Sequence, residues 1–118
     1  MRLHHVQLAI PPGSEAQCRA FYVGVLGWTE VPKPAALAAR GGLWLAVGEH
    51  QVHLGVEQDF RAARKAHAAF AVAELDALAQ RLREAGSSVE YDEAIPALRR
   101  FYVFDAVGNR LEFLEEQE

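Results

Sequence analysis

The chain carries one pattern of secondary-structure signals twice, and this repeat constrains the fold more than any other feature. The segment HVQLAI at residues 5–10 matches HAAFAV at 67–72 as His-x-x-apolar-Ala-β-branched. Because an internal repeat means that one supersecondary unit occurs twice, the sequence predicts an α+β fold of two βαβββ modules, paired half-barrels that enclose a cleft. Two further pairs keep a common spacing: helix ends at 26–27 and 85–86, and closing strands at 52–56 and 111–115.

The first module is expected over about residues 1–57. Residues 3–10 alternate between apolar and other side chains, which is typical of a strand with one buried face. Ser14, with Gln17 three residues later, has the pattern of a helix-capping box, and Gly27 is the expected helix end. The helix should bury one apolar stripe, made of Cys18, Phe21, Tyr22, Val25 and Leu26. Strands are then expected at 28–31, 43–47 and 51–56.

The second module is expected over about residues 67–118, after a polar linker at about 58–66. Leu75, Leu78 and Leu82 have helical spacing and predict a helix that ends at Gly86. The expected strands are 67–72, 89–95, 100–105 and 110–115, with a turn at Gly108 and Asn109. Since each module alone is too small to bury a comfortable core, we expect the 118 residues to form a single domain.

Composition excludes several classes of function. Apolar residues make up 51% of the chain and charged residues 24%, a balance that excludes disorder. The formal net charge of −4 argues against nucleic-acid binding, which needs a concentrated positive field. The single cysteine, Cys18, permits no intramolecular disulfide or CxxC motif and is interpreted as a core thiol. No apolar run approaches the ~20 residues of a membrane span, and the N-terminus lacks signal-peptide features, so we expect a cytoplasmic protein without membrane contact.

Four side chains that can bind a metal occupy equivalent positions of the repeat. His5 pairs with His67, and His53 pairs with Glu112. Strand alternation places each of them opposite the apolar residues that should pack on the helices, so all four are expected on the concave side of the sheets. Imidazole and carboxylate ligands suit a divalent ion such as Zn, Ni, Mn, Co or Fe(II). Two further histidines are interpreted as structural: His4, which should face away from His5, and His50, in a turn.

Other polar and aromatic side chains are candidates for substrate binding. Gln7 shares the strand face of His5. Trp44 and Tyr102 are either pocket residues or core residues, because the sequence does not determine the register of their strands. A basic cluster is either solvated charge or a mouth that binds a carboxylate or phosphate. Its members are Arg61, Arg64, Lys65, Arg99 and Arg100.

These features resemble the vicinal-oxygen-chelate superfamily, which contains glyoxalases, extradiol dioxygenases, methylmalonyl-CoA epimerases, fosfomycin-resistance transferases and bleomycin-binding proteins. The resemblance covers the whole chain, and its matching stretches are HV (5–6), FYVGVLGW (21–28), HAAF (67–70) and DAVGNRLEF (105–113). Enzymes of this family take one metal ligand from each first strand and a carboxylate from the last strand. The resemblance therefore implies that His5, His67 and Glu112 bind the metal.

The same resemblance implies a metal-dependent enzyme of the glyoxalase and dioxygenase class that acts on a small substrate with two adjacent oxygens. Glu112 would be its catalytic proton shuttle. His53 stands where glyoxalases carry Glu or Gln, which argues against glyoxalase I activity and leaves His53 either a fourth ligand or a residue that orients a ligand. The substrate-binding candidates are Gln7, Arg61, Lys65, Arg100 and Tyr102.

The alternative is a non-catalytic small-molecule binding protein of the bleomycin-resistance type, which would bind an antibiotic without a protein-bound metal. For either function we expect a homodimer, because a chain of this size leaves edge strands open to pairing.

Overall fold

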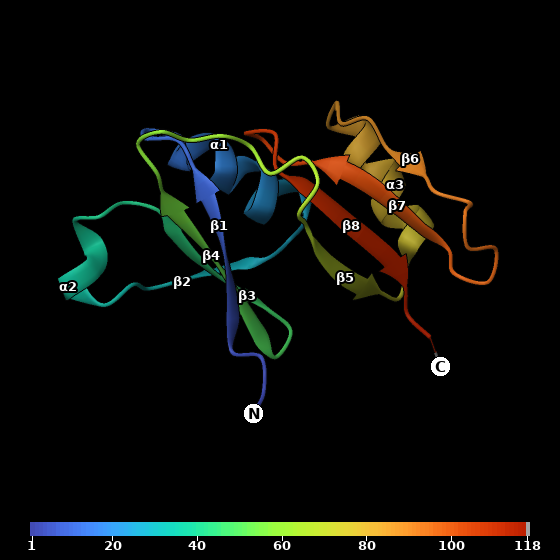
Figure 1. Cartoon of the computed structure of the whole chain (residues 1–118), viewed down its shortest axis with the longest axis horizontal. Helices are drawn as coiled ribbons and strands as arrows, with labels where there is room; N and C mark the ends of the chain where they lie inside the picture. Colours follow the sequence, from blue (N-terminus) through green and yellow to red (C-terminus); the bar gives the residue numbers. More distant parts are fainter. Residues whose placement is uncertain (118) are drawn as a thin grey trace. The chain divides into compact units, whose positions relative to one another are not determined.

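The chain divides into two compact units, unit 1 (Met1–Ala62) and unit 2 (Ala63–Glu118), each built around one four-stranded sheet (Figure 1). The structure is a computed structural model and describes residues 1–117. The boundary between the units lies within the linker expected at about 58–66. The expectation that the two modules form a single domain stays a prediction.

The strands and helices follow the order expected from the repeat. Unit 1 contains β1 (His5–Ile10), α1 (Glu15–Arg19), the π-helix η1 (Ala20–Val25), β2 (Thr29–Val31), α2 (Ala35–Ala38), β3 (Leu43–Val47) and β4 (His50–Val56). Unit 2 contains β5 (Ala68–Val72), α3 (Leu75–Glu84), β6 (Glu90–Tyr91), β7 (Arg100–Phe104) and β8 (Arg110–Glu115).

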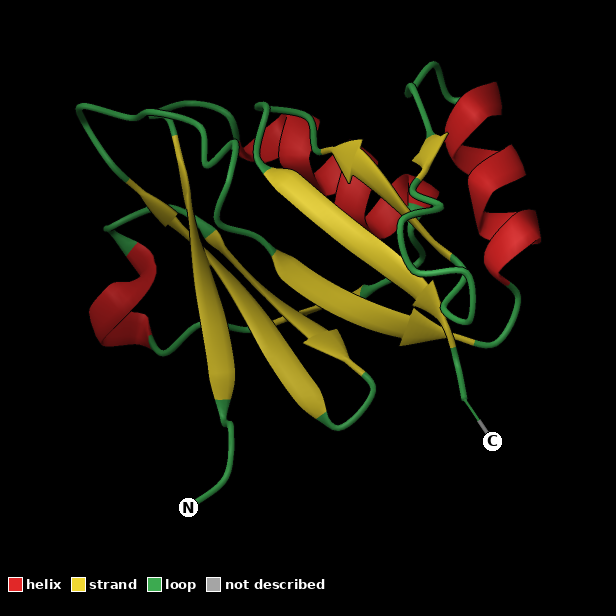
Figure 2. Ribbon diagram, turned by 45° about the vertical axis from the view of Figure 1, so that its right-hand side comes forward, coloured by secondary structure: helices red, strands yellow, loops and turns green. Residues whose placement is uncertain are grey.

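The two sheets have the same topology, which confirms the α+β prediction of two βαβββ-type modules. Their strand orders are β1-β4-β3-β2 and β5-β8-β7-β6. Figure 2 shows the strands of both sheets in yellow. In each sheet the first and last strands pair in parallel, and the remaining pairs are antiparallel. Gln7 lies opposite His53 in one sheet, and Ala69 lies opposite Glu112 in the other. The register therefore places His53 and Glu112 at equivalent points, as the repeat predicts.

The first helix buries four of the five residues of the predicted stripe, leaves Val25 half-buried and differs in further details from the expectation. Cys18 and Tyr22 are fully buried, and the chain leaves the helix at Gly27 with φ of +78°, a conformation that glycine adopts without strain. Ser14 occupies the N-cap position as predicted, but its side chain does not cap the helix, because the hydroxyl donates to the carbonyl of Pro11 at 2.7 Å. From Ala20 onward the helix widens into η1, where the amide of Leu26 donates to the carbonyl of Phe21.

Two further local expectations need correction. The strand expected at 89–95 is only β6, Glu90–Tyr91, because the carboxylate of Asp92 accepts the amide of Ala94 and turns the chain. The short helix α2 was not expected, and it buries none of its residues. In unit 2 the predicted apolar face of α3 is confirmed, with Leu75, Leu78 and Leu82 buried.

The longest α-helix within residues 1–117 is α3, with ten residues. No helix in this part of the chain is long and apolar enough to cross a membrane.

Candidate functional site

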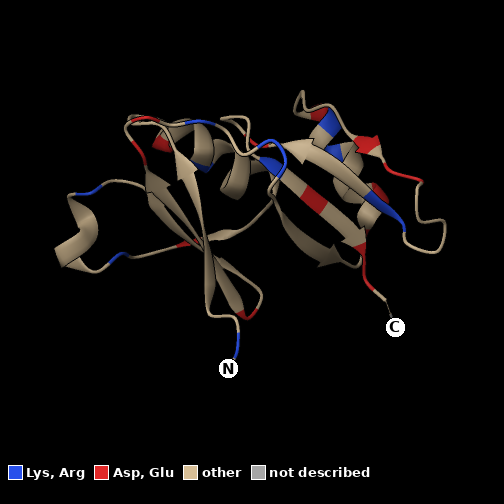
Figure 3. Ribbon diagram, in the orientation of Figure 1, with Lys and Arg blue, Asp and Glu red and all other residues tan. Residues whose placement is uncertain are grey.

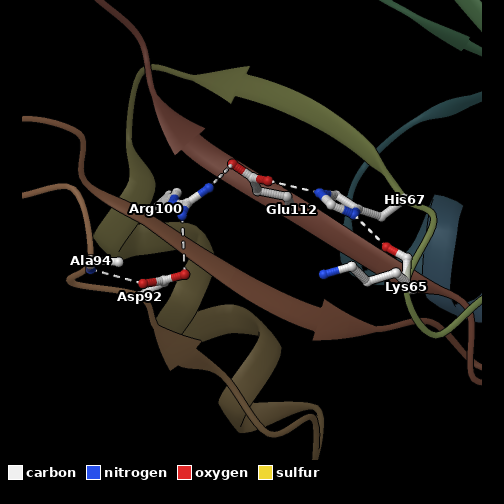
Figure 4. Close-up of polar contacts among 6 residues, drawn as sticks. All are labelled: Lys65, His67, Asp92, Ala94, Arg100 and Glu112. Atoms are coloured by element: carbon white, nitrogen blue, oxygen red, sulfur yellow. Dashed lines mark hydrogen bonds and ion pairs between the residues drawn. The ribbon is translucent and has the colours of Figure 1, made fainter.

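A histidine and a glutamate meet on the sheet of unit 2. His67 immediately precedes β5, and Glu112 lies on β8, the strand that pairs with β5. The imidazole Nε2 of His67 lies 2.9 Å from the carboxylate Oε1 of Glu112, as Figure 4 shows. The Glu112 side chain is only 7% exposed and that of His67 26% exposed, so solvent reaches the pair from the histidine side. The sequence placed both residues on one face, and the structure brings them into contact.

A main-chain carbonyl determines which nitrogen of His67 carries hydrogen. Nδ1 lies 2.9 Å from the carbonyl oxygen of Lys65. Since a carbonyl only accepts, Nδ1 is the donor there, and a neutral His67 has a lone pair on Nε2. That lone pair then points at a carboxylate oxygen, which is also an acceptor. The contact between Nε2 and Oε1 therefore needs a positive species between the two atoms, either a proton or a metal ion.

The second oxygen of Glu112 is held by an arginine. The guanidinium of Arg100, on β7, donates to Glu112 Oε2 at 3.3 Å and to the carboxylate of Asp92 at 3.1 Å (Figure 4). Burial acts to lower the pKa of Arg100, but the hydrogen bond to Glu112 and the nearby charges of Asp92 and Glu112 leave this pKa raised. The guanidinium therefore stays charged and directs Oε1 toward His67.

In unit 1 the predicted histidines form part of a stack of rings. The ring of His53, on β4, lies between those of Trp44 and His5, with centroid distances of 4.1 Å on both sides. His53 Nε2 lies 2.8 Å from the amide oxygen of Gln51, so this nitrogen is the donor. Nδ1 is then the nitrogen of His53 with a free lone pair for a ligand.

Burial and neighbouring positive groups lower the pKa of His53. Its side chain is largely enclosed, and His5, His4 and Lys33 lie close enough to disfavour a further positive charge. The ring is therefore held in its neutral form, which is the form that can bind a metal.

The ring stack borders a cavity of about 630 Å³ within unit 1. Gln7 and Trp44 line it together with His5 and His53, which places Trp44 at a pocket, one of its two interpretations, while the substrate-binding role of Gln7 stays a prediction. The amide of Gln7 lies so close to Gly55 that a Cβ there would come within 2.4 Å of the Gln7 nitrogen. The backbone of Gly55 therefore leaves the space that Gln7 occupies.

His4 was expected to face away from His5, and this expectation is wrong. The Nδ1 atoms of the two rings lie 3.0 Å apart, and His4 lines the same cavity. Strand alternation does not apply to His4, because β1 begins only at His5.

The basic cluster expected from the sequence divides between different contacts. Arg100 faces Glu112, whereas Arg99 makes a two-pronged ion pair with Asp76 of α3. Arg99 precedes β7, whereas Arg100 is the first residue of this strand. Lys65 contributes its main-chain carbonyl to His67, and Arg61 is exposed in the segment before β5.

Two residues around the His67–Glu112 pair were not predicted from the sequence. Asp92 orients Arg100, and the Arg110 guanidinium lies 3.8 Å above the ring of Tyr102. Arg110 lies two positions before Glu112 on β8, so strand alternation was the signal that could have placed it on the same face. Tyr102 lies directly opposite Glu112 in the β7–β8 register, and its ring meets that of His67 edge-on at 5.5 Å.

The described residues form metal-capable pairs rather than a complete cluster. Within residues 1–117, no three His, Cys, Asp or Glu side chains come together as a metal site. The pairs are His67 with Glu112 in unit 2, and His5 with His53 in unit 1.

Two sheets of βαβββ type with histidine and carboxylate residues on their last strands define a protein of the vicinal-oxygen-chelate class. The chain belongs to the glyoxalase-like domain family, whose family model matches residues 11–114. A search of curated protein sequences gave no significant match.

Solved structures share this fold over nearly the whole chain. A protein assigned to the glyoxalase family from Bacillus anthracis is 45% identical, with a TM-score of 0.95 over 99% of this chain and 96% of that chain. A lactoylglutathione lyase from Agrobacterium tumefaciens is 18% identical (TM-score 0.72, 93% of this chain and 91% of that chain). The fosfomycin resistance protein FosX from Listeria monocytogenes is 14% identical (TM-score 0.78, 99% and 94%). The last two similarities show the fold alone.

Proposed function

We propose that this protein is a metal-dependent enzyme of the glyoxalase and dioxygenase class, with His67 and Glu112 as protein ligands of a divalent ion. The observation that supports the proposal most strongly is the lone pair of His67 Nε2, which faces Glu112 Oε1 at 2.9 Å. A second observation is the hydrogen bond from Nδ1 to the Lys65 carbonyl. Metal-binding histidines commonly donate their other ring nitrogen in this way, which orients the ring.

The residues of unit 2 fit a divalent ion such as Zn, Ni, Mn, Co or Fe(II). One imidazole nitrogen and one carboxylate oxygen are suitable donors for these ions. Arg100 occupies only Oε2 of Glu112, so Oε1 remains available. The other predicted ligands, His5 and His53, belong to unit 1, and their participation stays a proposal.

The reaction class follows from these residues. When bound, a divalent ion supplies positive charge beside two adjacent substrate oxygens, where negative charge develops during the reaction. Glu112 is the proposed catalytic residue: Arg100 fixes Oε2, and Oε1 has two lone pairs, one for the ion and one that can take a proton from the substrate and return it. Arg100 and Tyr102 flank this carboxylate and are proposed to position the substrate, with Gln7, Arg61 and Lys65 as further proposed contacts.

One observation favours the alternative, a non-catalytic protein that binds a small molecule. The Arg100 guanidinium already balances the buried charge of Glu112, so the pocket does not require a metal for electrostatic balance. In that case the His67–Glu112 pair would share a proton and serve the structure of the pocket.

Metal content separates the two functions. Protein purified without chelators should retain a divalent metal by elemental analysis, and its melting temperature should rise in a thermal-shift series with Ni, Zn, Mn, Co and anaerobic Fe(II). His67→Ala and Glu112→Gln should lose both effects. His50→Gln, with an exposed side chain on β4, is the matched control and should retain them. Absence of bound metal together with unchanged melting temperatures in all five series would support the non-catalytic alternative.

We also propose that the protein is a homodimer in solution. Each sheet leaves its first strand and its second strand at an edge, where open hydrogen-bonding groups favour pairing with another chain. Analytical ultracentrifugation across a dilution series should give twice the chain mass of 13.0 kDa, and a monomer at all concentrations would contradict this. The cytoplasmic location expected from the sequence stays a prediction.

A further inference from the structure

A second cavity in unit 2 lies beside the His67–Glu112 pair. It has a volume of about 520 Å³ and is lined by residues of β6, β7 and β8 and by Arg64. Tyr102, which lies opposite Glu112 and meets the ring of His67, is part of its wall. Tyr102 is therefore a wall residue of the cavity that also contacts the proposed metal ligand His67.

Two guanidinium groups in this cavity lie over aromatic rings. Arg110 lies 3.8 Å from the ring centroid of Tyr102, and Arg64 lies 4.5 Å from that of Phe104. Phe104 is directly opposite Arg110 in the β7–β8 register, so the two stacked pairs are neighbours. Stacking fixes the plane of a guanidinium and leaves its N–H groups free to donate to an oxyanion.

Apart from this stacking, the two guanidinium groups have no partner of opposite charge among residues 1–117. In the part of the chain that the structure describes, Arg64 and Arg110 have no side-chain hydrogen bond or ion pair with a carboxylate. Arg99 and Arg100 differ in this respect, because each is paired with at least two acidic residues. Arg64 and Arg110 therefore have unused capacity to bind an anion.

The basic and acidic residues that line the cavity lie on different segments of the chain. Acidic residues that line it, Glu90, Asp92 and Glu93, lie on β6 and on the segment that follows, and Asp92 is already paired with Arg100. In Figure 3, β7 and β8 each begin with a basic segment, and β8 has an acidic segment in its middle. An anionic group is favoured at the guanidinium groups of Arg64 and Arg110 and disfavoured at the carboxylates of Glu90 and Glu93. The ring of Phe104 is 42% exposed, an uncommon state for a large apolar side chain, and offers an apolar contact.

We infer that this cavity is an anion subsite, in which Arg110 and Arg64 bind the carboxylate, phosphate or phosphonate group of the substrate and Phe104 contacts its apolar part. The inference rests on the proposed function for the identity of the ligand as a substrate. The proposed substrate is a small organic oxyanion whose reacting part lies toward His67 and Glu112. Binding of the anion itself depends only on the residues of the cavity.

The test uses benzoate and phenylphosphonate as probes, with benzyl alcohol as their uncharged counterpart. Each is titrated into the full chain in EDTA, and binding is followed by chemical-shift changes of the backbone amides of β7 and β8. Benzoate or phenylphosphonate should bind, and the stronger of the two identifies the preferred oxyanion. Arg110→Gln should weaken binding by about tenfold or more, since a charge-assisted hydrogen bond is lost. Arg64→Gln, a change at an exposed position, should also weaken binding of the anionic probe relative to the original chain.

Arg81→Gln, on the exposed surface of α3, is the matched control and should bind as the original chain does. Equal binding of benzyl alcohol and benzoate would overturn the inference, as would unchanged binding in both arginine variants. Repeating the titration with His67→Ala separates the two proposals. If this variant and the metal-free chain bind the anion while no metal binds in the thermal-shift series, the metal proposal fails and the anion subsite stands.

Discussion

Arg100 holds Glu112 Oε2 at 3.3 Å with one nitrogen and Asp92 at 3.1 Å with another. The Arg100 side chain is 16% exposed and Glu112 is 7% exposed, so the ion pair is largely shielded from water. The guanidinium of Arg100, on β7, therefore connects β8 with the segment that follows β6 through two carboxylates.

Arg100→Gln should lower the free energy of unfolding by about 2–3 kcal/mol, because it leaves the buried carboxylate of Glu112 without its cation. Urea denaturation followed by circular dichroism measures the change. Arg81→Gln, at an exposed helix position, should stay within about 0.5 kcal/mol of the original chain. A loss for Arg100→Gln no larger than that of the control would show that the ion pair contributes no stability.

Stability should fall in mildly acidic solution because of His53. Burial, with the neighbouring His5, His4 and Lys33, lowers its pKa in the folded chain below the ordinary 6.5. Between the folded and unfolded pKa values the unfolded chain binds more protons, so the free energy of unfolding rises with pH in that window. The contribution of neutral His53 to the free energy of unfolding is complete above pH 6.5 and is lost as the pH falls to the pKa of His53 in the folded chain. Urea denaturation in EDTA at several pH values should show this slope, and His53→Gln should reduce it. An equal slope in both chains would contradict the prediction.

Two glycines with positive φ should respond differently to alanine. Gly42 has φ of +84°, and a Cβ there would lie 2.1 Å from the carbonyl oxygen of Leu54. Gly48 has φ of +56° with nothing within 4 Å. Gly48→Ala should therefore lower the free energy of unfolding by only about 1–2 kcal/mol, the cost of holding alanine in the left-handed backbone conformation. Gly42→Ala should cost clearly more, because a main-chain atom must move. Melting temperatures of the two variants give the comparison, and similar values would contradict the prediction.

Asn109 should stabilise the segment that carries Arg64 and His67. Its side-chain oxygen accepts the amide of Ala63 at 3.0 Å, and the amide of Arg110 donates to the carbonyl of Ala63 at 2.8 Å. Asn109→Ala should lower stability by about 1–3 kcal/mol, since the Ala63 amide loses its acceptor. Faster hydrogen exchange at the Ala63 amide would identify the site of the effect. Unchanged exchange at that amide would show that Asn109 does not hold the segment.

Much of the architecture could be predicted because it depends on local periodicity. The alternation of residues 5–10 and 67–72 and the spacing of Leu75, Leu78 and Leu82 reflect the geometry of strands and helices. The repeat then determined the order of the strands and placed His53 and Glu112 at equivalent positions. Single local hydrogen bonds were less predictable: Ser14 bonds Pro11 rather than the helix, and Asp92 shortens β6 by accepting the amide of Ala94.

Side-chain contacts across strands were decided by the tertiary structure. Alternation placed His67 and Glu112 on one face, but only the pairing of β5 with β8 and the position of the Lys65 carbonyl brought Nε2 to Oε1. The stacking of His53 between Trp44 and His5 likewise depends on three strands being paired in register. A face is a property of a short segment, whereas the partner of each atom is set by residues far away in the chain.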